Sequence, residues 1–173
     1  MMFRTHLLFA LFAYIFVIKV FSLNFSILFA LLLCFGTILP DIDSPESYVN
    51  KKYLLGFGKG IAFFSKHRGF WHSIFGLLIF IALATFIFFI NNYFIFVLAL
   101  PLGYFLHLMA DSLNPSGIKW FWKSNKLHLK WKIKTGHVTE QLFFVLILFL
   151  TTILVLGNKG IKEISAFVMN IKP

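Results

Sequence analysis

Five apolar stretches, separated by more polar segments of different lengths, dominate the pattern of the chain. They cover residues 5–21, 23–39, 73–90, 93–109 and 141–156. Each is near the lower end of the ~17–25 residues that an α-helix needs to cross a bilayer. The pattern therefore predicts five membrane-spanning helices, with the first hairpin as the least sharply bounded part.

Composition supports a membrane class. The chain has 173 residues, of which 60% are hydrophobic, and its mean hydropathy is +0.87. Soluble domains are closer to half apolar. No internal repeat and no second domain is detected, so we expect an all-α polytopic membrane protein with one integral membrane domain over residues 1–173. No small-residue cleavage site follows the first apolar run, which favours a retained helix over a signal peptide.

The charged residues predict an orientation. With five spans, the N-terminus and the loops 40–72 and 110–140 share one side of the membrane. That side carries Arg4, Lys51, Lys52, Lys59, Lys66, Arg68, Lys119, Lys123, Lys126, Lys130, Lys132 and Lys134, against Lys19, Lys159, Lys162 and Lys172 on the other. Basic residues accumulate on the cytoplasmic side. We therefore expect a multi-pass protein of the cytoplasmic (inner) membrane, with both large loops in the cytoplasm.

The net charge of +10 also raises the question of nucleic-acid binding. The basic residues fall in the loops between the apolar runs, which is the arrangement that suits anionic lipid headgroups. We expect the lipid bilayer and no nucleic acid as a partner. The single cysteine, Cys34, lies inside an apolar run, which excludes a disulfide framework and a zinc site built on several cysteines.

The first motif with chemical content is Leu39-Pro40-Asp41-Ile42-Asp43-Ser44-Pro45. A carboxylate beside hydrocarbon is costly, and such residues mark functional sites by default. Pro40 is expected to end the helix and to favour extended geometry at Leu39. In an extended segment Asp41 and Asp43 would point the same way. Two carboxylates directed at one point predict a bound cation.

Two further motifs end or begin apolar runs on the same side. His67, Arg68 and His72 directly precede the third run, and His72 with Ser73 is expected in its first helical turn. His107 and Asp111 end the fourth run at a spacing that stacks both on one helix face. Neutral imidazole and carboxylate are ligands that zinc, iron and manganese accept. The motifs therefore predict a divalent-metal site of one or two ions.

The topology places nearly all remaining polar chemistry at the same membrane face. Every histidine and every acidic residue except Glu163 falls there: His6, Asp41, Asp43, Glu46, His67, His72, His107, Asp111, His128, His137 and Glu140. Each taken singly is better explained as a cap, a turn or an anchor. Caps, turns and anchors do not explain why residues of three separate segments converge on one membrane face, and the set therefore favours a metal site.

Other segments carry weaker expectations. The stretch 47–66 mixes aromatic residues with lysines, and loop 110–140 contains Trp120, Trp122 and Trp131, so both are expected to lie along the headgroups. Residues 161–171 show helical spacing of apolar positions, which predicts a short surface helix. Glu140 is either an active-site carboxylate or simply a favourable charge at a helix N-terminus.

Three sequences, LPDIDSP, HRGFWHS and GYFLHLMADSLNPSGI, together resemble the YdjM-like membrane-bound metal-dependent hydrolases, a family described as inner-membrane proteins. The resemblance covers most of the chain. It implies a hydrolase whose metal ligands are Asp41, Asp43, His67, His72, His107 and Asp111, with His6 as a further candidate. Trp71 and Lys66 depart from the small residues expected there, which affects the substrate entrance more than the ligands.

These observations lead to one functional expectation and one alternative. We expect metal-dependent hydrolysis of a lipid-borne ester or phosphoester, with Asp43 and Glu140 as candidate catalytic carboxylates and with Arg68 and Lys134 neutralising a phosphate. The alternative is a membrane protein that binds divalent metal or organises lipid without chemistry. A conducting transporter is disfavoured, because the middles of the apolar runs lack polar residues.

Overall fold

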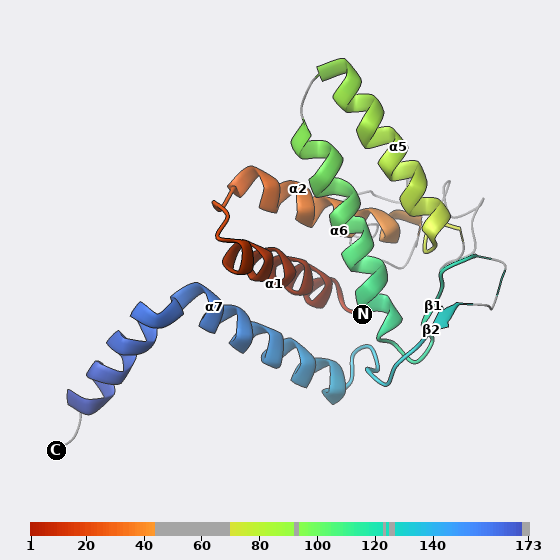
Figure 1. Cartoon of the computed structure of the whole chain (residues 1–173). Coiled ribbons are helices and arrows are strands. Elements are labelled where there is room, and N and C mark those ends of the chain that lie inside the picture. The colour runs from red at the N-terminus through yellow and green to blue at the C-terminus, as the bar shows by residue number, and fades with distance from the viewer. Residues whose placement is uncertain (44–69, 92–93, 123, 125–126, 171–173) are drawn as a thin grey trace.

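A computed structural model describes residues 1–43, 70–91, 94–122, 124 and 127–170 of the chain. The described part is mostly helical, which confirms that aspect of the predicted fold (Figure 1). The elements in chain order are α1 (Phe3–Phe21), α2 (Ile27–Ile38), the 3-10 helix η1 (Leu39–Asp43), α5 (Ile74–Asn91), α6 (Phe94–Ser112), β1 (Ile118–Lys119), β2 (His128–Leu129) and α7 (Val138–Asn170).

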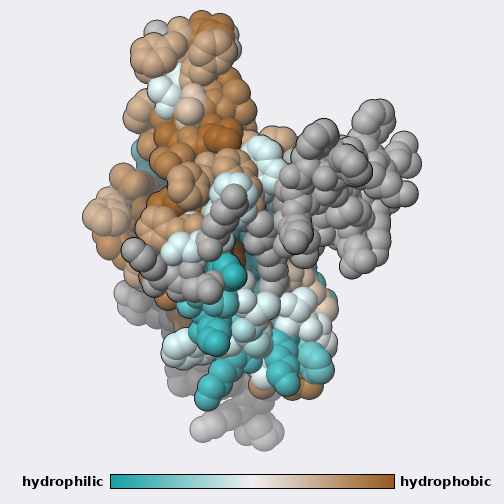
Figure 2. All heavy atoms as spheres, turned by 90° about the vertical axis from the view of Figure 1, so that its right-hand side faces the viewer, coloured by the Kyte–Doolittle hydropathy of each residue, from teal (hydrophilic) through white to brown (hydrophobic). Residues whose placement is uncertain are grey.

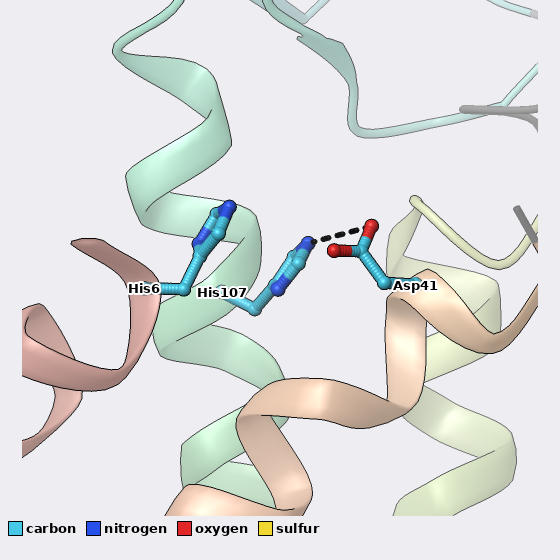
Figure 3. Close-up of side chains that lie close together, drawn as sticks. All are labelled: His6, Asp41 and His107. Carbon is cyan, nitrogen blue, oxygen red and sulfur yellow. Dashed lines mark ion pairs between the residues drawn. The ribbon is translucent and has the colours of Figure 1, made fainter. Parts of the chain in front are cut away.

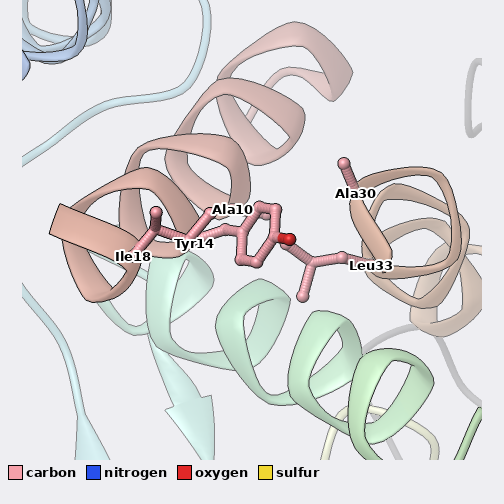
Figure 4. Close-up of a cluster of buried hydrophobic side chains, with 5 residues drawn as sticks. All are labelled: Ala10, Tyr14, Ile18, Ala30 and Leu33. Carbon is pink, nitrogen blue, oxygen red and sulfur yellow. The ribbon is translucent and has the colours of Figure 1, made fainter. Parts of the chain in front are cut away.

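Helices α1 and α2 form a hairpin around a small apolar core. Ser22 ends α1 in the left-handed conformation, and the Ser26 hydroxyl caps α2 by accepting the Phe29 N–H. The Tyr14 hydroxyl accepts the Ser26 N–H at 3.0 Å, which ties the two helices together at the turn. Its ring packs with Ala10, Ile18, Ala30 and Leu33 (Figure 4). The hairpin fixes the direction in which α2 returns.

Helices α2 and α6 cross at backbone contact because glycines face each other there. A Cβ atom added at Gly36 would overlap the Leu100 carbonyl, and one at Gly103 would overlap the Leu33 carbonyl. Small residues permit this kind of close approach between membrane helices. The crossing brings the C-terminal end of α2 against the last turns of α6.

Helix α5 begins at Ile74, so His72 and Ser73 do not belong to its first turn, where the sequence predicts them. The Ser73 hydroxyl accepts the Phe75 N–H at 3.2 Å, so Ser73 acts as an N-cap and His72 precedes the helix. Serine is favoured at this position because its side chain satisfies an otherwise unpaired backbone donor. The Tyr104 hydroxyl of α6 donates to the Trp71 carbonyl, which fixes the segment containing His72 against α6.

The connection from α6 to α7 contains a small β-hairpin that the apolar pattern did not predict. Gly117, with φ of 58°, closes a turn onto the Asn114 carbonyl, and β1 then pairs antiparallel with β2. Trp120 was expected at the membrane surface, and this is wrong. It is buried against Leu108 and Ile118, and its indole N–H donates to the Ser112 hydroxyl at 3.2 Å.

Helix α7 packs along α1, for example where Phe9 meets Phe143 with ring centroids 6.4 Å apart. Gly157 breaks the helical geometry with φ of 58° and ψ of −164°, so α7 consists of two helical parts. The second part extends to Asn170 and confirms the helical conformation predicted for the end of the chain.

Two helical segments among the described residues are long and apolar enough to cross a membrane: Phe3–Phe21 and Val138–Gly157. The apolar helices Ile27–Asp41, Ile74–Ile90 and Val97–Ser112 are shorter. Many large apolar side chains on these helices are exposed, and the face in Figure 2 is predominantly apolar in its upper part. The length criterion therefore supports two spans and leaves the predicted count of five as a proposal.

All five α-helices of the described residues have one terminus at the same end of the molecule, which we call the shared end. Helices α1, α5 and α7 begin there, and α2 and α6 finish there. The evidence is a set of links between them: Met1 N to Asp111 Oδ1, Met2 N to Glu140 Oε1, Ile74 N to Trp120 O, and His107 to Thr37. Polar side chains gather in the lower half of the view onto this side (Figure 2).

Candidate metal centre

Five of the predicted metal ligands meet at the shared end. His6 comes from the first turn of α1, Asp41 from η1, His72 from the segment before α5, and His107 and Asp111 from α6. All except Asp41 are buried, while the Asp41 side chain keeps 23% of its surface exposed. The first and last of them, His6 and Asp111, are more than 100 residues apart in the sequence.

His107 is at the centre of this group. Its Nδ1 lies 2.8 Å from the Thr37 carbonyl oxygen, and because a carbonyl can only accept, Nδ1 carries the proton. In the neutral imidazole, Nε2 then has the lone pair. It lies 3.8 Å from Asp41 Oδ1 and 3.9 Å from Asp111 Oδ2, and it has no hydrogen-bond partner among the described residues.

The neighbouring imidazoles pack against the His107 ring. The rings of His6 and His107 are stacked with centroids 3.9 Å apart, and Asp41 approaches His107 from the other side (Figure 3). The His72 ring meets His107 edge-on at 5.4 Å, and its Nε2 lies 3.5 Å from Asp41 Oδ1. Three imidazoles and two carboxylates thus surround one small volume.

Two overlapping groups in this volume have the composition and spacing to hold an ion. One contains His6, Asp41 and His107, and the other contains His72, His107 and Asp111. Within each group the candidate ligand atoms lie within 4.8 Å of one another. His107 belongs to both, so the two groups are alternatives for the same imidazole.

Asp111 is held in place by several donors. Its Oδ1 lies 2.6 Å from the Met1 amino group, accepts the Asn114 side-chain amide at 2.9 Å and lies 3.2 Å from His6 Nε2. A carboxylate fixed by donors on one oxygen directs the other with little freedom. Here Oδ2 is directed toward His107.

The local geometry predicted for Asp41 and Asp43 is wrong. Residues 39–43 form the 3-10 helix η1, and Leu39 is helical with φ of −55° and ψ of −41°. Proline is tolerated in the first turn of a helix, where its missing N–H is not needed. The two-residue period of an extended segment is therefore absent. Asp41 reaches the centre from a helical turn.

Glu140, a predicted catalytic carboxylate, is bound by backbone groups outside the two candidate ligand groups. Both carboxylate oxygens of buried Glu140 accept backbone N–H groups, Oε1 from Met2 at 2.6 Å and Oε2 from Gly136 at 2.7 Å. This geometry favours a structural anchor at the start of α7. Lys134 is exposed. His128 is also separate, since it lies on β2 with Nε2 3.0 Å from the Ser116 carbonyl.

Several predicted residues lie outside the described residues. These are His67, Arg68, Glu46 and the stretch 47–66, together with the side chain of Asp43. Their assignments as ligands or phosphate-binding groups stay predictions.

Two residues important for the geometry were missed at the sequence level. Thr37 contributes a backbone carbonyl, which no side-chain pattern can reveal. Asn114 was not considered as a contact of Asp111, although its spacing of three residues from Asp111 was a usable signal. Its side chain holds Asp111, and its carbonyl accepts the N–H groups of Gly117 and Trp131.

Comparisons with known proteins place the chain in a family. No solved structure matches it. It is 41% identical over 97 residues to the inner membrane protein YdjM of Escherichia coli (strain K12) and, to the same extent, to that of Shigella flexneri. The matched region is 54% of this chain and 46% of each relative, so the chain matches about half the length of these proteins. The model of the family described as YdjM inner membrane protein matches residues 1–171, and the chain therefore belongs to this family of inner membrane proteins.

Proposed function

We propose that this inner membrane protein holds a divalent metal ion at the shared end and uses it to hydrolyse a lipid-borne ester or phosphoester. One observation carries the metal part of the proposal. His107 Nε2 lies 3.8 and 3.9 Å from the two nearest carboxylate oxygens, too far for hydrogen bonds. Two ligands of one tetrahedral zinc ion, each about 2.0–2.1 Å from it, are separated by roughly 3.3 Å. The distances are thus close to those of ligands that share an ion.

The geometry of His107 favours one ion over two in the described part of the site. Because Nδ1 is bound to Thr37, only Nε2 can act as a ligand, and one imidazole nitrogen binds one ion. The two overlapping groups both need this atom. A second ion would require ligands outside the described residues, of which Asp43 and His67 are the candidates by sequence.

The types of ligand atom at the site limit which metal ions it is expected to bind. Imidazole and carboxylate suit zinc, manganese and iron. The hydrogen bond from His107 Nδ1 to a carbonyl is the arrangement that commonly orients a metal-bound histidine. The site therefore has side chains suited to bind such a metal ion, and a hydrogen bond from His107 to Thr37 that would orient one of them.

The proposed hydrolysis would depend on contributions from the metal ion and from the residues around it. A bound divalent ion lowers the pKa of a coordinated water and polarises the bond under attack. The buried side chains would hold the ion in a fixed position. These are His6, His72, His107 and Asp111. Asp41 is partly exposed, unlike the other four, so the substrate would approach on its side. Arg68 remains the proposed contact to a substrate phosphate.

The membrane arrangement extends the same proposal. Consecutive helices alternate in direction relative to the shared end, as five passes through a bilayer require. The concentration of basic residues in the loops at this end supports a cytoplasmic location for it. We therefore propose five spans with α2, α5 and α6 as short ones, and a lipid-linked substrate reached from the cytoplasmic leaflet.

The burial of the ligands supports a second candidate. With His72 fully buried and His107 nearly so, a bound ion could serve to fix the helix ends without meeting a substrate. The protein would then bind metal or organise lipid without catalysis.

Elemental analysis and a lipid-hydrolysis screen test both candidates. Purified protein should contain about one divalent ion per chain, and His107→Ala should lose it, while His128→Ala, outside the centre, should keep it. The screen compares turnover with chelator, without chelator and after readdition of metal. Absence of metal from the wild-type protein would refute metal-dependent hydrolysis and any metal-binding role, and bound metal without turnover would select the non-catalytic candidate.

A further inference from the structure

The connection between α6 and α7 presents an exposed surface that combines apolar and basic side chains. We define the hairpin surface as Leu129, Lys130, Trp131 and Lys132, all of which are exposed. Trp131 keeps 66% of its surface accessible. Figure 1 shows the hairpin at the side of the molecule where the N-terminus and the end of α6 lie. This surface takes no part in the metal centre.

The surface is rigidly attached to the fold. The Trp131 N–H donates to the Asn114 carbonyl at 3.0 Å, and the Ile133 N–H donates to the Leu113 carbonyl at 3.1 Å. Directly after the paired strand β1, Trp120 is buried in the core. The exposed indole therefore lies on a fixed backbone and does not belong to a freely moving loop.

An indole this exposed needs an explanation, because water is an unfavourable environment for so large an apolar area. Tryptophan is enriched at the boundary between bilayer and water, where its ring meets headgroups. Lys130 and Lys132 flank it in sequence, and ammonium groups near the membrane surface are attracted to anionic lipids. The alternative, a solvated basic loop, accounts for the lysines and leaves the tryptophan unexplained.

We propose that the hairpin surface binds anionic phospholipid headgroups of the bilayer in which the protein is embedded. Trp131 supplies the apolar contact at headgroup depth, and Lys130 and Lys132 pair with phosphate oxygens. Membership of an inner-membrane family and the attachment of the hairpin to the ends of membrane helices favour lipid over nucleic acid as the polyanion.

The position of this surface links it to the metal centre through one residue. Asn114 accepts the Trp131 N–H with its carbonyl and donates to Asp111 Oδ1 with its side chain, at 3.0 and 2.9 Å. A lipid held at the hairpin surface is thus fixed relative to Asp111. The lipid-binding proposal itself does not depend on metal or catalysis.

Quenching of tryptophan fluorescence by brominated lipids tests the proposal in nanodiscs. The Trp131 share of the signal is the difference between the full-length protein and Trp131→Phe, which removes an exposed ring and leaves the core intact. Two discs with the same ratio of phosphatidylglycerol to phosphatidylcholine are compared. In one disc the phosphatidylglycerol is brominated, and in the other the phosphatidylcholine is brominated. We expect brominated phosphatidylglycerol to quench this share about twofold more strongly.

Charge variants complete the test. The double variant Lys130→Gln with Lys132→Gln should remove the preference, whereas Lys19→Gln, an exposed lysine at the far end of α1, should retain it. Equal quenching by the two lipids would overturn the anionic preference, and no quenching by either would overturn membrane contact. A Trp131 signal that responds in detergent to duplex DNA and not to the brominated lipids would show a nucleic-acid surface and refute the proposal.

Discussion

The Nδ1 atom of His107 in α6 lies 2.8 Å from the carbonyl oxygen of Thr37 at the end of α2. This contact is available only because the two helices cross at backbone distance through Gly36 and Gly103. It fixes both the tautomer and the orientation of the ring, so that Nε2 faces Asp41 and Asp111. The packing of two helices thus determines which nitrogen can bind an ion.

The crossing yields the first prediction. Gly103→Ala should force α2 away from α6, because its Cβ would overlap the Leu33 carbonyl and approach the Thr37 nitrogen. Overpacking of this kind costs about 1–3 kcal/mol in free energy of unfolding. Displacing Thr37 should also weaken metal binding. Unfolding in detergent and calorimetric metal titration measure the two effects.

The matched control for this variant is Leu102→Ala, which changes an exposed neighbour on α6. It should leave metal affinity unchanged. Unaltered metal affinity in Gly103→Ala would show that the position of Thr37 does not control the His107 ring.

Asn114 provides the second prediction. Asn114→Ala removes the amide that donates to Asp111 Oδ1. Loss of a residue that orients a ligand lowers metal affinity by roughly 10–100-fold, and we expect an effect in this range by calorimetry. Ser116→Ala, in the exposed part of the same turn, is the control. Equal affinities in the two variants would contradict a positioning role for Asn114.

The sequence predicts which side chains converge at the candidate centre better than it predicts their local geometry. The spacing of His107 and Asp111 placed both on one helix face, and the structure has them adjacent and buried. Asp41 was correctly expected near the histidines for the wrong reason, since Pro40 begins a helical turn instead of ending regular structure. The effect of proline depends on whether the preceding helix continues, which the local sequence does not decide.

Some features of the fold were likewise predictable from the sequence, and others were not. Apolar runs located the five helices to within a few residues, because hydrophobicity is a property of each side chain. The β-hairpin and the burial of Trp120 depend on pairing between residues about ten positions apart and on the Ser112 hydroxyl. The role of Thr37 depends on a backbone atom. Such features arise from tertiary packing and leave no pattern in the sequence.

Glu140 yields a prediction that separates an anchor from a catalytic carboxylate. In Glu140→Gln one acceptor oxygen becomes an NH₂ group that faces the N–H of Met2 or Gly136. A buried donor left facing a donor costs about 1–3 kcal/mol. We expect reduced stability with metal content unchanged, as measured by thermal unfolding and elemental analysis. The exposed Gln141→Ala is the control.

A different result is expected if Glu140 acts in catalysis. Stability would then be near that of the wild type while turnover in the lipid screen falls. That outcome would contradict the anchor role assigned from its two backbone contacts.

The proposed topology predicts the location of four reporter fusions. Fusions after Asn50, Asn91, Asn125 and the C-terminus should read inside, outside, inside and outside, because basic residues accumulate in the two large loops. Paired alkaline phosphatase and fluorescent-protein reporters measure this. A cytoplasmic signal at Asn91 would refute the five-span proposal and with it the approach of substrate from the cytoplasmic leaflet.

His107 and Asp111 give the prediction that bears most directly on function. If both bind one ion, His107→Ala and Asp111→Ala should each remove metal and turnover, and the double variant should be little worse than either. Residues that act as one unit are strongly non-additive. If the pair served only as a contact within α6, each substitution should cost about 0.2–0.5 kcal/mol of stability and leave turnover intact. Losing a catalytic ion removes several kcal/mol of transition-state stabilisation, so the two explanations differ greatly in rate. Turnover and metal content of the three variants decide between them, and near-normal turnover in either single variant would exclude the pair from an active site.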